Sequence, residues 1–394
     1  MRPHPITDGI SWVGAVDWDR RVFDELVPVP EGTTYNSYLV RGTDKTVLID
    51  AVDPAFERVL FDRLATAGVE RLDHVVVNHA EQDHSGALPA LLARFPEATV
   101  LATSKAKGLL VEHLGVPAER LQAVEDGGRL ALGGKTLRFV HFPWVHWPET
   151  MITFVEEDRV LFPGDLFGSH LAFGTPLDAD PAATLVEAKR YYGEIMMPFR
   201  KVIARNLPKI EQLDPLLVAP SHGPVHRQPA GILDAYRSWL ADTPRNAAVV
   251  AYASMHDSTR SMVRHLGEEL GLRGVRVELF GLVHVDLGKL ATALVDAATI
   301  VFGSPTVLGG AHPLVASAAL VTNLLKPKAR FLAVVGSYGW GGKMKDQLVG
   351  LLPDLELELV GSVLTRGTAK PDDLAALDLL AATVAERHAG LRLT

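Results

Sequence analysis

The chain has 394 residues, 47% of them hydrophobic, and a formal net charge of −8 from 39 basic and 47 acidic residues. This length favours two or three domains, and the absence of a dense Lys/Arg block argues against nucleic acid as a partner. The sequence contains no cysteine. Disulfides, cysteine-ligated iron–sulfur clusters and thiolate zinc sites are therefore excluded, and any metal must bind nitrogen or oxygen.

The N-terminal segment 1–16 lacks a basic stretch followed by an apolar run, which is the pattern of an export signal. No apolar run elsewhere approaches the roughly 18 residues that a membrane-spanning helix needs. We therefore predict a cytoplasmic protein with no membrane contact.

Short β-rich runs separated by helical stretches and Gly/Pro turns characterise the first half of the chain. A long amphipathic stretch at about 183–206 interrupts these runs. The mixture predicts a domain over residues 1–246 in which strands and helices form an αβ sandwich. The predicted strands lie at 36–40, 46–49, 75–77, 137–140, 151–155, 160–162 and 216–219.

A polar, proline-containing break at 242–246 is followed by the apolar run 247–252, which suits a parallel strand buried on both faces. After it, strand-like runs alternate with helical patterns, giving five β and five α units in roughly 148 residues. This alternation predicts a doubly wound parallel sheet over residues 247–394, closed by a terminal helix near 372–389. The later predicted strands lie at 275–280, 299–303, 331–336 and 356–361.

The strongest functional signal is the segment His79-Ala80-Glu81-Gln82-Asp83-His84, which directly follows a predicted strand. Three further candidates also follow apolar runs: His146, Asp165 and His222. Loops that leave one edge of a sandwich can converge, and a carboxylate such as Asp165 can bridge two cations. The spacing alone fits zinc, manganese or iron, while the two carboxylates of the first segment favour iron or manganese.

Three loops of the second half follow predicted strands, where doubly wound sheets bind ligands. They are rich in Gly, Ser and Thr and suit a phosphate at a helix start, and their aromatic side chains could stack on an isoalloxazine ring. Neither G-x-G-x-x-G nor the Walker pattern occurs in them, so a mononucleotide such as FMN fits better than NAD. The candidate flavin contacts are Ser254, Met255, His256, Asp257, Ser258 and Thr259; Ser304, Pro305, Thr306, Val307, Leu308, Gly309 and Gly310; and Ser337, Tyr338, Gly339, Trp340, Gly341 and Gly342.

In motif order and domain order the chain resembles the flavodiiron proteins, also called rubredoxin:oxygen oxidoreductases, from about residue 5 to 390. The segments 32–36, 145–148 and 219–223 look like those of the family. The resemblance implies a metallo-β-lactamase-like αβ/βα sandwich followed by a flavodoxin-like domain. In the family's first half the hydrolase pattern H-x-H-x-D-H becomes H-x-E-x-D-H, and Glu81 reproduces this change.

The resemblance also implies a ligand set for two iron ions. By similarity, His79, Glu81 and His146 would bind one iron, Asp83, His84 and His222 would bind the other, and Asp165 would bridge them. In some relatives the histidine matching His84 is displaced by water. Two departures concern the flavin: His256 replaces the usual tryptophan of the first loop, and Leu308-Gly309 replaces the paired asparagines often found in the second.

The activity implied is FMN-dependent reduction of dioxygen to water or of nitric oxide to nitrous oxide. With no cysteine in the sequence, the electron donor is expected to be a separate protein such as rubredoxin. A sandwich domain of 246 residues has a radius of gyration of roughly 18 Å, which would place flavin and irons of one chain roughly 40 Å apart. A head-to-tail homodimer, or a dimer of dimers, as in the family, would bring them together across the subunit interface.

Two other readings remain open at this point: a dizinc hydrolase fused to a flavodoxin-like module, and an electron carrier with an inert metal site. The sequence does not rank dioxygen against nitric oxide. Tyr191, Tyr192 and His170 are candidates for side chains around the metals that influence this choice.

Overall fold

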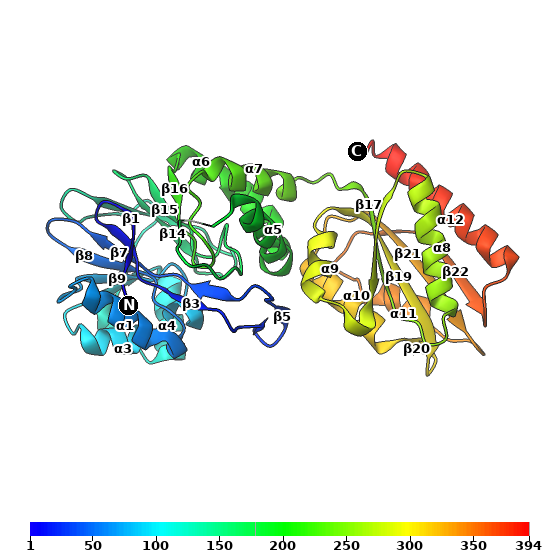
Figure 1. Cartoon of the computed structure of the whole chain (residues 1–394), viewed down its shortest axis with the longest axis horizontal. Coiled ribbons are helices and arrows are strands. Elements are labelled where there is room, and N and C mark those ends of the chain that lie inside the picture. Colours follow the sequence, from blue (N-terminus) through cyan, green and yellow to red (C-terminus); the bar gives the residue numbers. More distant parts are fainter. Residues whose placement is uncertain (178, 394) are drawn as a thin grey trace. The chain divides into compact units, whose positions relative to one another are not determined.

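The computed structural model describes residues 1–177 and 179–393 and divides into two compact units (Figure 1). Unit 1 comprises Met1–Tyr192 and Phe199–Leu240, and unit 2 comprises Gly193–Pro198 and the chain from Ala241 onward. The domain boundary that we predict between residues 246 and 247 stays a prediction. Within the described residues, no helix has both the length and the apolar character needed to cross a bilayer.

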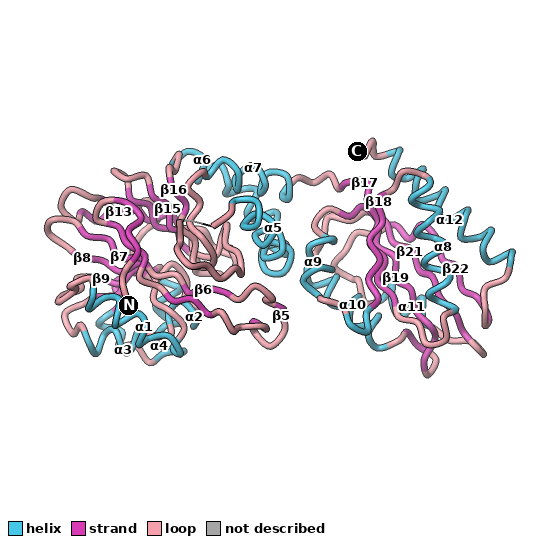
Figure 2. Tube along the Cα trace, in the orientation of Figure 1, coloured by secondary structure: helices cyan, strands magenta, loops and turns pink. Residues whose placement is uncertain are grey.

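Unit 1 is built on two main sheets, which Figure 2 shows in magenta. The seven-stranded sheet has the order β1 (His4–Thr7), β2 (Ile10–Trp12), β7 (Tyr38–Arg41), β8 (Thr46–Ile49), β9 (His74–Val76), β10 (Thr99–Ala102) and β11 (Leu121–Ala123). The five-stranded sheet has the order β12 (Arg129–Ala131), β13 (Thr136–His141), β14 (Met151–Val155), β15 (Val160–Phe162) and β16 (Leu217–Val218). Two small hairpin-like pairs join β3 (Ala15–Asp17) to β6 (Thr33–Tyr35) and β4 (Val22–Phe23) to β5 (Val27–Pro28).

The helices of unit 1 connect these strands. They are α1 (Glu57–Thr66), α2 (Gln82–Ser85), α3 (Leu88–Arg94), α4 (Ser104–Leu114), α5 (Pro181–Tyr191), α6 (Arg200–Leu213) and α7 (Pro229–Leu240). In Figure 1, α1, α3 and α4 lie beside the sheet that contains β8 and β9, whereas α6 and α7 lie beside β16. The predicted amphipathic stretch at 183–206 contains parts of two α-helices, because a π-helical turn at Tyr192–Met196 and a 3₁₀ turn at Met197–Phe199 separate α5 from α6.

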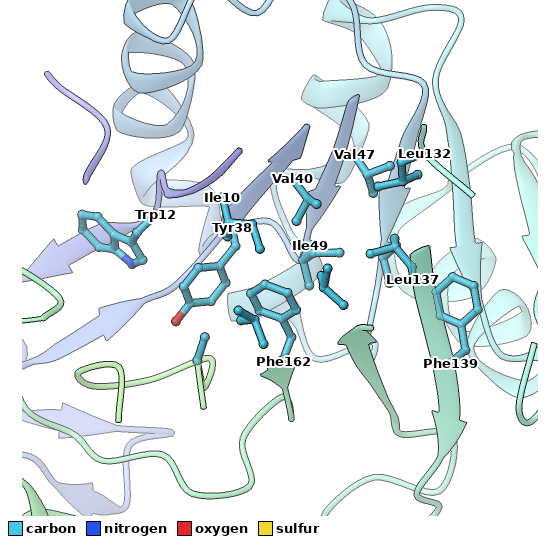
Figure 3. Close-up of a cluster of buried hydrophobic side chains, with 14 of the residues drawn as sticks. Ile10, Trp12, Tyr38, Val40, Val47, Ile49, Leu132, Leu137, Phe139 and Phe162 are labelled. Carbon is cyan, nitrogen blue, oxygen red and sulfur yellow. The ribbon is translucent and has the colours of Figure 1, made fainter. Parts of the chain in front are cut away.

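The core of unit 1 lies between its two sheets (Figure 3). Tyr38 and Ile49 from the first sheet face Phe162 of the second, and the ring centroids of Tyr38 and Phe162 are 4.9 Å apart. All three side chains are at most 2% exposed. Side chains point alternately to opposite faces of a strand, so each strand contributes every second residue to this layer. The packing holds the two sheets together and so fixes the loops that connect their ends.

Unit 2 is a parallel sheet of the order β18 (Arg276–Gly281), β17 (Arg245–Tyr252), β19 (Ala297–Val307), β21 (Phe331–Tyr338) and β22 (Glu358–Arg366), with β20 (Gly310–Ala311) paired to β19. Helices α8 (Ser258–Leu272) and α12 (Pro371–Gly390) cover one face, and α9 (Leu287–Leu294) and α10 (Pro313–Leu325) cover the other (Figure 1). The short helix α11 (Met344–Gly350) contacts β19 and β20. A two-sheet αβ sandwich followed by a doubly wound parallel sheet is the predicted fold class, which is confirmed.

Four loops carry the predicted metal ligands to one edge of the sandwich. Strands β13 and β15 both run antiparallel to β14, and β16 runs parallel to β15, so their carboxyl ends lie at the same edge of the second sheet. The segment that follows β9 leaves the first sheet in the same region, because Met151 at the start of β14 donates its backbone N–H to the carbonyl of Asn78 (2.8 Å). The topology therefore brings residues more than 140 positions apart in the chain to one place.

His388 of α12 provides a test of packing in unit 2. Its ring is buried, its Nδ1 donates to Asn246 Oδ1 (2.8 Å), and its Nε2 accepts from Thr299 Oγ1 (2.6 Å). The bond accepted at Nε2 requires the neutral ring, and burial lowers the pKa of His388 to about 4. The pKa of this histidine in the unfolded chain is near 6.5. The stabilisation from the neutral ring should therefore be fully present above pH 6.5, and the free energy of unfolding should decrease by up to about 3 kcal/mol as the pH falls toward 4.

Calorimetric unfolding of the full chain between pH 4 and 8 measures this effect. A His388→Gln variant, which cannot titrate, is expected to show a flatter pH dependence than the wild type. Equal pH dependence in the two proteins would contradict this account of His388.

Candidate metal centre

The structure brings all seven predicted metal ligands together in unit 1, within two groups whose candidate ligand atoms lie within 4.8 Å of one another. Four of them lie in the segment that follows β9 and continues into the short helix α2: His79, Glu81, Asp83 and His84. The other three lie in loops after β13, β15 and β16, respectively: His146, Asp165 and His222. The adjacent Gly164 has a φ of +62°, a backbone conformation that residues with a Cβ rarely adopt.

Two groups of ligands share one carboxylate. In group A (His79, Glu81 and His146), the Nε2 atoms of His79 and His146 lie 3.3 and 3.0 Å from Asp165 Oδ2. In group B (Asp83, His84 and His222), the Nε2 atoms of His84 and His222 lie 3.1 and 3.7 Å from Asp165 Oδ1. Each oxygen of Asp165 therefore belongs to a different group, which is the arrangement of a carboxylate that bridges two metal ions.

The spacing between these donor atoms fits metal coordination. His146 Nε2 lies 3.0 Å from Glu81 Oε2, and Asp83 Oδ2 lies 3.0 and 3.1 Å from the Nε2 atoms of His84 and His222. Ligands about 2.1 Å from one metal ion are separated from each other by roughly 3.0–3.4 Å. Four imidazoles and three carboxylates form a nitrogen and oxygen donor set that suits iron, manganese or zinc.

Unpartnered buried atoms point to the same conclusion. Both ring nitrogens of His79 and His84, both carboxylate oxygens of Asp83, and Asp165 Oδ1 are buried and make no hydrogen bond of acceptable geometry with the described residues. Buried polar groups in folded proteins are normally paired, and leaving them unpaired is costly. A cation in each group would satisfy the Nε2 atoms of both histidines and the carboxylate oxygens that face them, so these residues fit a dinuclear metal centre.

Protons partly replace the cations in the metal-free site. Burial by itself would lower the pKa of His84, but the carboxylates of Asp83 and Asp165 outweigh it and raise this pKa to about 10. The pKa of His146 is raised to about 9, because hydrogen bonds to Asp165 and Glu81 outweigh burial. Burial would raise the pKa of Asp165, yet the neighbouring His79 and His84 hold it well below its usual value. The site is thus built to hold positive charge next to its carboxylates.

Backbone and side-chain contacts fix the orientation of the ligands. His222 Nδ1 donates to the carbonyl oxygen of Thr34 (2.6 Å), which leaves its Nε2 lone pair directed at group B. Behind His79, the carboxylate of Asp50 accepts both the backbone N–H (2.7 Å) and the side-chain amide (2.8 Å) of Asn78. These contacts hold the ligand segments before any metal binds.

Two of the three residues suggested to surround the metals lie against a ligand. The ring centroids of His170 and Tyr191 lie 4.9 and 5.9 Å from that of His222, and His170 Nδ1 lies 2.8 Å from Thr33 Oγ1. Burial, followed by the charge of His222, lowers the pKa of His170 well below its ordinary value. Tyr192 instead packs its ring against Tyr236 and Trp239.

A cavity of ≈ 360 Å³ opens beside both groups. Glu81 and Asp83 contribute to its wall, so a small molecule in the cavity can reach the metal centre. Most of this wall was not predicted from the sequence; Phe23, for example, belongs to β4, which has only two residues and carries no periodic pattern. The remaining lining residues are Arg20, Phe23, Asp24, Asp53, Gln82, His113 and Trp147.

In unit 2, the three predicted flavin loops lie at the carboxyl ends of β17, β19 and β21 and contact one another. Thr259 Oγ1 and Ser337 Oγ are 3.2 Å apart, and Lys343 donates its backbone N–H to Gly309 O (2.7 Å). The second loop is shorter than predicted, because β19 extends to Val307 and turns back through Leu308-Gly309 into β20. Its residues 304–307 are therefore strand, not loop.

The same edge of unit 2 exposes large apolar side chains. Leu308 is fully exposed, and Trp340 and Met255 are 92% and 56% exposed. Three residues with hydroxyl groups lie at or just before the start of the 15-residue helix α8: Ser254, Ser258 and Thr259. Ser254 Oγ accepts the backbone N–H of Arg260 in the first turn of this helix (3.2 Å). Apolar surface for a flat ring beside a helix start for a phosphate is what FMN requires, so the residues fit this cofactor.

Comparison with known proteins assigns the family. Residues 33–223 match the family model described as ODP family beta lactamase. The nitric oxide reductase of Moorella thermoacetica is 37% identical over 368 residues, covering 91% of this chain and 92% of that protein. The coenzyme F420H2 oxidase of Methanothermobacter marburgensis is 34% identical over 363 residues, covering 89% of each chain.

Among solved structures, the rubredoxin oxygen:oxidoreductase of Desulfovibrio gigas superimposes with a TM-score of 0.95 at 27% identity, covering 100% of both chains. Similarity of this extent spans both the sandwich and the parallel sheet, and includes the segments that carry the seven ligands. The chain belongs to the flavodiiron protein family.

Proposed function

We propose that this protein is an FMN-dependent di-iron oxidoreductase that reduces dioxygen to water, nitric oxide to nitrous oxide, or both, with electrons from an external donor. The observation that carries the proposal is the pair of ligand groups sharing the two oxygens of Asp165. Family membership and the names of the relatives support iron in place of zinc and reduction in place of hydrolysis.

Each metal would have four protein ligands, three from its own group and one oxygen of Asp165. When bound, two iron ions would supply electrons and adjacent open coordination positions for the gas. The carboxylate of Asp165 places the two metal positions next to each other. The Thr34 carbonyl keeps His222 Nε2 directed at group B. The cavity beside Glu81 and Asp83 gives a diatomic molecule access while the ligands themselves stay largely buried.

The overall reactions require electrons and protons in fixed proportion. Two NO with two electrons and two protons give N2O and water, and O2 with four electrons and four protons gives two water molecules. The flavin loops of unit 2 would hold FMN, and bound FMN would supply electron transfer between the donor and the metals. The donor is a rubredoxin-type protein or, by analogy with the relative named coenzyme F420H2 oxidase, coenzyme F420H2. A head-to-tail homodimer and a cytoplasmic location remain part of this proposal.

Anaerobic stopped-flow spectroscopy tests the proposal. The reduced protein, with its iron and FMN quantified, is mixed separately with dioxygen and with nitric oxide while flavin absorbance is followed. We expect about two irons per chain and flavin reoxidation fast enough to sustain turnover with at least one gas, and the two rates rank the substrates. Two zinc ions per chain with slow flavin reoxidation would refute the proposal and support the dizinc hydrolase. Two irons with a flavin that neither gas reoxidises would support the electron carrier.

A further inference from the structure

Glu149 is a buried carboxylate next to the metal centre that the proposed function does not use. Glu149 is 2% exposed and lies in the loop between β13 and β14. Glu149 Oε1 accepts the backbone N–H of Ala80 (2.9 Å). Ala80 lies between His79 and Glu81, so this hydrogen bond is made to the segment that carries two ligands of group A.

The same residue is joined to two other parts of unit 1. Glu149 follows His146, the third ligand of group A, by three positions, and its backbone carbonyl accepts a hydrogen bond from Thr103 Oγ1 (2.9 Å). Thr103 follows β10 and also caps helix α4 by accepting the N–H of Ala106 (3.2 Å). Glu149 thus connects the segment carrying His79, the loop carrying His146 and the end of a strand.

One oxygen of Glu149 has no hydrogen-bond partner among the described residues. Glu149 Oε2 is buried and makes no hydrogen bond to any described residue, and Glu149 lines a cavity of ≈ 250 Å³ together with Lys105 and His141. A buried carboxylate is costly to keep unless it has a compensating role. Its one side-chain hydrogen bond goes to the ligand segment, which indicates what that role is.

Group B has a counterpart of different chemistry. Asn36 Nδ2 donates to the carbonyls of Pro220 and Gly223 (2.7 Å each), which flank His222. Asn36 Oδ1 in turn accepts from Trp12 Nε1 (2.8 Å). Each ligand group therefore has its own buried polar side chain that holds the backbone beside a ligand.

We propose that Glu149 is the positioning residue of the group A metal, and that it sets the affinity of this metal independently of the group B metal. The inference rests on the metal-binding part of the proposed function and needs no assumption about the gas. Residues that orient metal ligands typically change metal affinity by about 10- to 100-fold when they are removed. Loss of the Ala80 hydrogen bond should allow His79 and Glu81 to move relative to His146, while Asp83, His84 and His222 keep their supports.

The test is an anaerobic cobalt(II) titration of the metal-free full-length protein, followed by visible absorption and by calorimetry. A His146→Ala variant identifies the absorption that belongs to group A. Glu149→Ala is expected to weaken binding at group A by about 10- to 100-fold and to leave group B within about threefold of the wild type. Asn36→Ala is expected to give the reverse pattern. Glu149→Gln, which keeps an acceptor oxygen, should restore group A binding to within about threefold of the wild type.

Several outcomes would overturn the inference: equal weakening of both groups by Glu149→Ala, no weakening at all, or failure of Glu149→Gln to restore binding. Glu149→Leu, which keeps side-chain volume without an acceptor, replaces the alanine variant if circular dichroism shows that the latter is unfolded. If neither variant folds, Glu149 supports the whole unit and the inference is wrong. Glu156→Ala, which removes a partly exposed carboxylate paired with Arg129, serves as the control. Wild-type protein that binds two cobalt ions, but whose iron- and FMN-loaded form reduces neither gas, would refute the proposed function and leave this inference standing.

Discussion

Replacing Asp165 with alanine is expected to abolish stable binding of both metal ions and to lower gas reduction by more than about 100-fold. The reason is that Asp165 Oδ2 faces the histidines of group A and Asp165 Oδ1 faces those of group B. No other described residue belongs to both groups in this way. Removing a residue that only orients ligands typically costs about 10- to 100-fold in metal affinity or activity, so removing a shared ligand should cost more.

Metal analysis, FMN content and steady-state gas consumption of Asp165→Ala check this prediction together. FMN content should match the wild type, because the flavin loops belong to unit 2. Glu81→Ala, which removes a ligand of group A alone, should lose one metal and retain the other. Asp62→Ala, at an exposed position of α1, is the control and should behave like the wild type. An Asp165→Ala protein that keeps two metals and full activity would show that this carboxylate is not the bridge.

Raising the pH from 7 to 8.5 is expected to strengthen metal binding by about tenfold per pH unit at each ligand group. In the metal-free protein, nearby carboxylates outweigh burial and raise the pKa of His84 to about 10 and of His146 to about 9. Both rings are therefore protonated at pH 7, and a metal ion must displace at least one proton from each group. Each proton displaced adds about one unit to the slope of log affinity against pH.

The same pKa values predict an effect on the stability of the metal-free protein, with the opposite pH dependence. Because the folded-state pKa values exceed the unfolded value near 6.5, the stabilisation from protonated His84 and His146 is fully present below pH 6.5 and is lost as the pH rises through 9 to 10. The metal-free protein should thus unfold at a lower temperature at pH 10 than at pH 8, whereas metal-loaded protein should not show this loss.

Zinc(II) titration of metal-free protein in weakly buffered solution, with a pH indicator, measures the protons released. We expect one or more protons per metal ion in the wild type and fewer in His84→Ala. The exposed His284 of unit 2 supplies the control, since His284→Ala should release as many protons as the wild type. Binding that is independent of pH between 7 and 8.5 would contradict the raised pKa values.

Most of the fold of unit 2 could be predicted from the sequence. The predicted strands 247–252 and 331–336 lie within β17 and β21, because parallel strands buried on both faces appear as uninterrupted apolar runs. The first 35 residues gave no such signal. Strands β1 to β6 there have two to four residues each, too few for a period of two to be recognised. The extension of β19 through residues 304–307 was also not predicted, since it depends on the pairing of Ser304 and Pro305 with β21 and on the pairing of residues 306–307 with β20.

By itself, the sequence determined which residues are the candidates for metal binding. Four candidate ligands lie within six consecutive positions after a strand, so this cluster can be recognised from the sequence alone. The sequence could not determine which oxygen of Asp165 faces which group, or that Tyr192 packs against Tyr236 and Trp239. Nor could it determine that Glu149 and Asn36 form hydrogen bonds with the ligand segments. These relations join residues such as Glu149 and Ala80, 69 positions apart, or Asn36 and Gly223, 187 positions apart. Contacts at such separations form only when the packing of the core closes the two sheets on each other, so only the tertiary structure decides them.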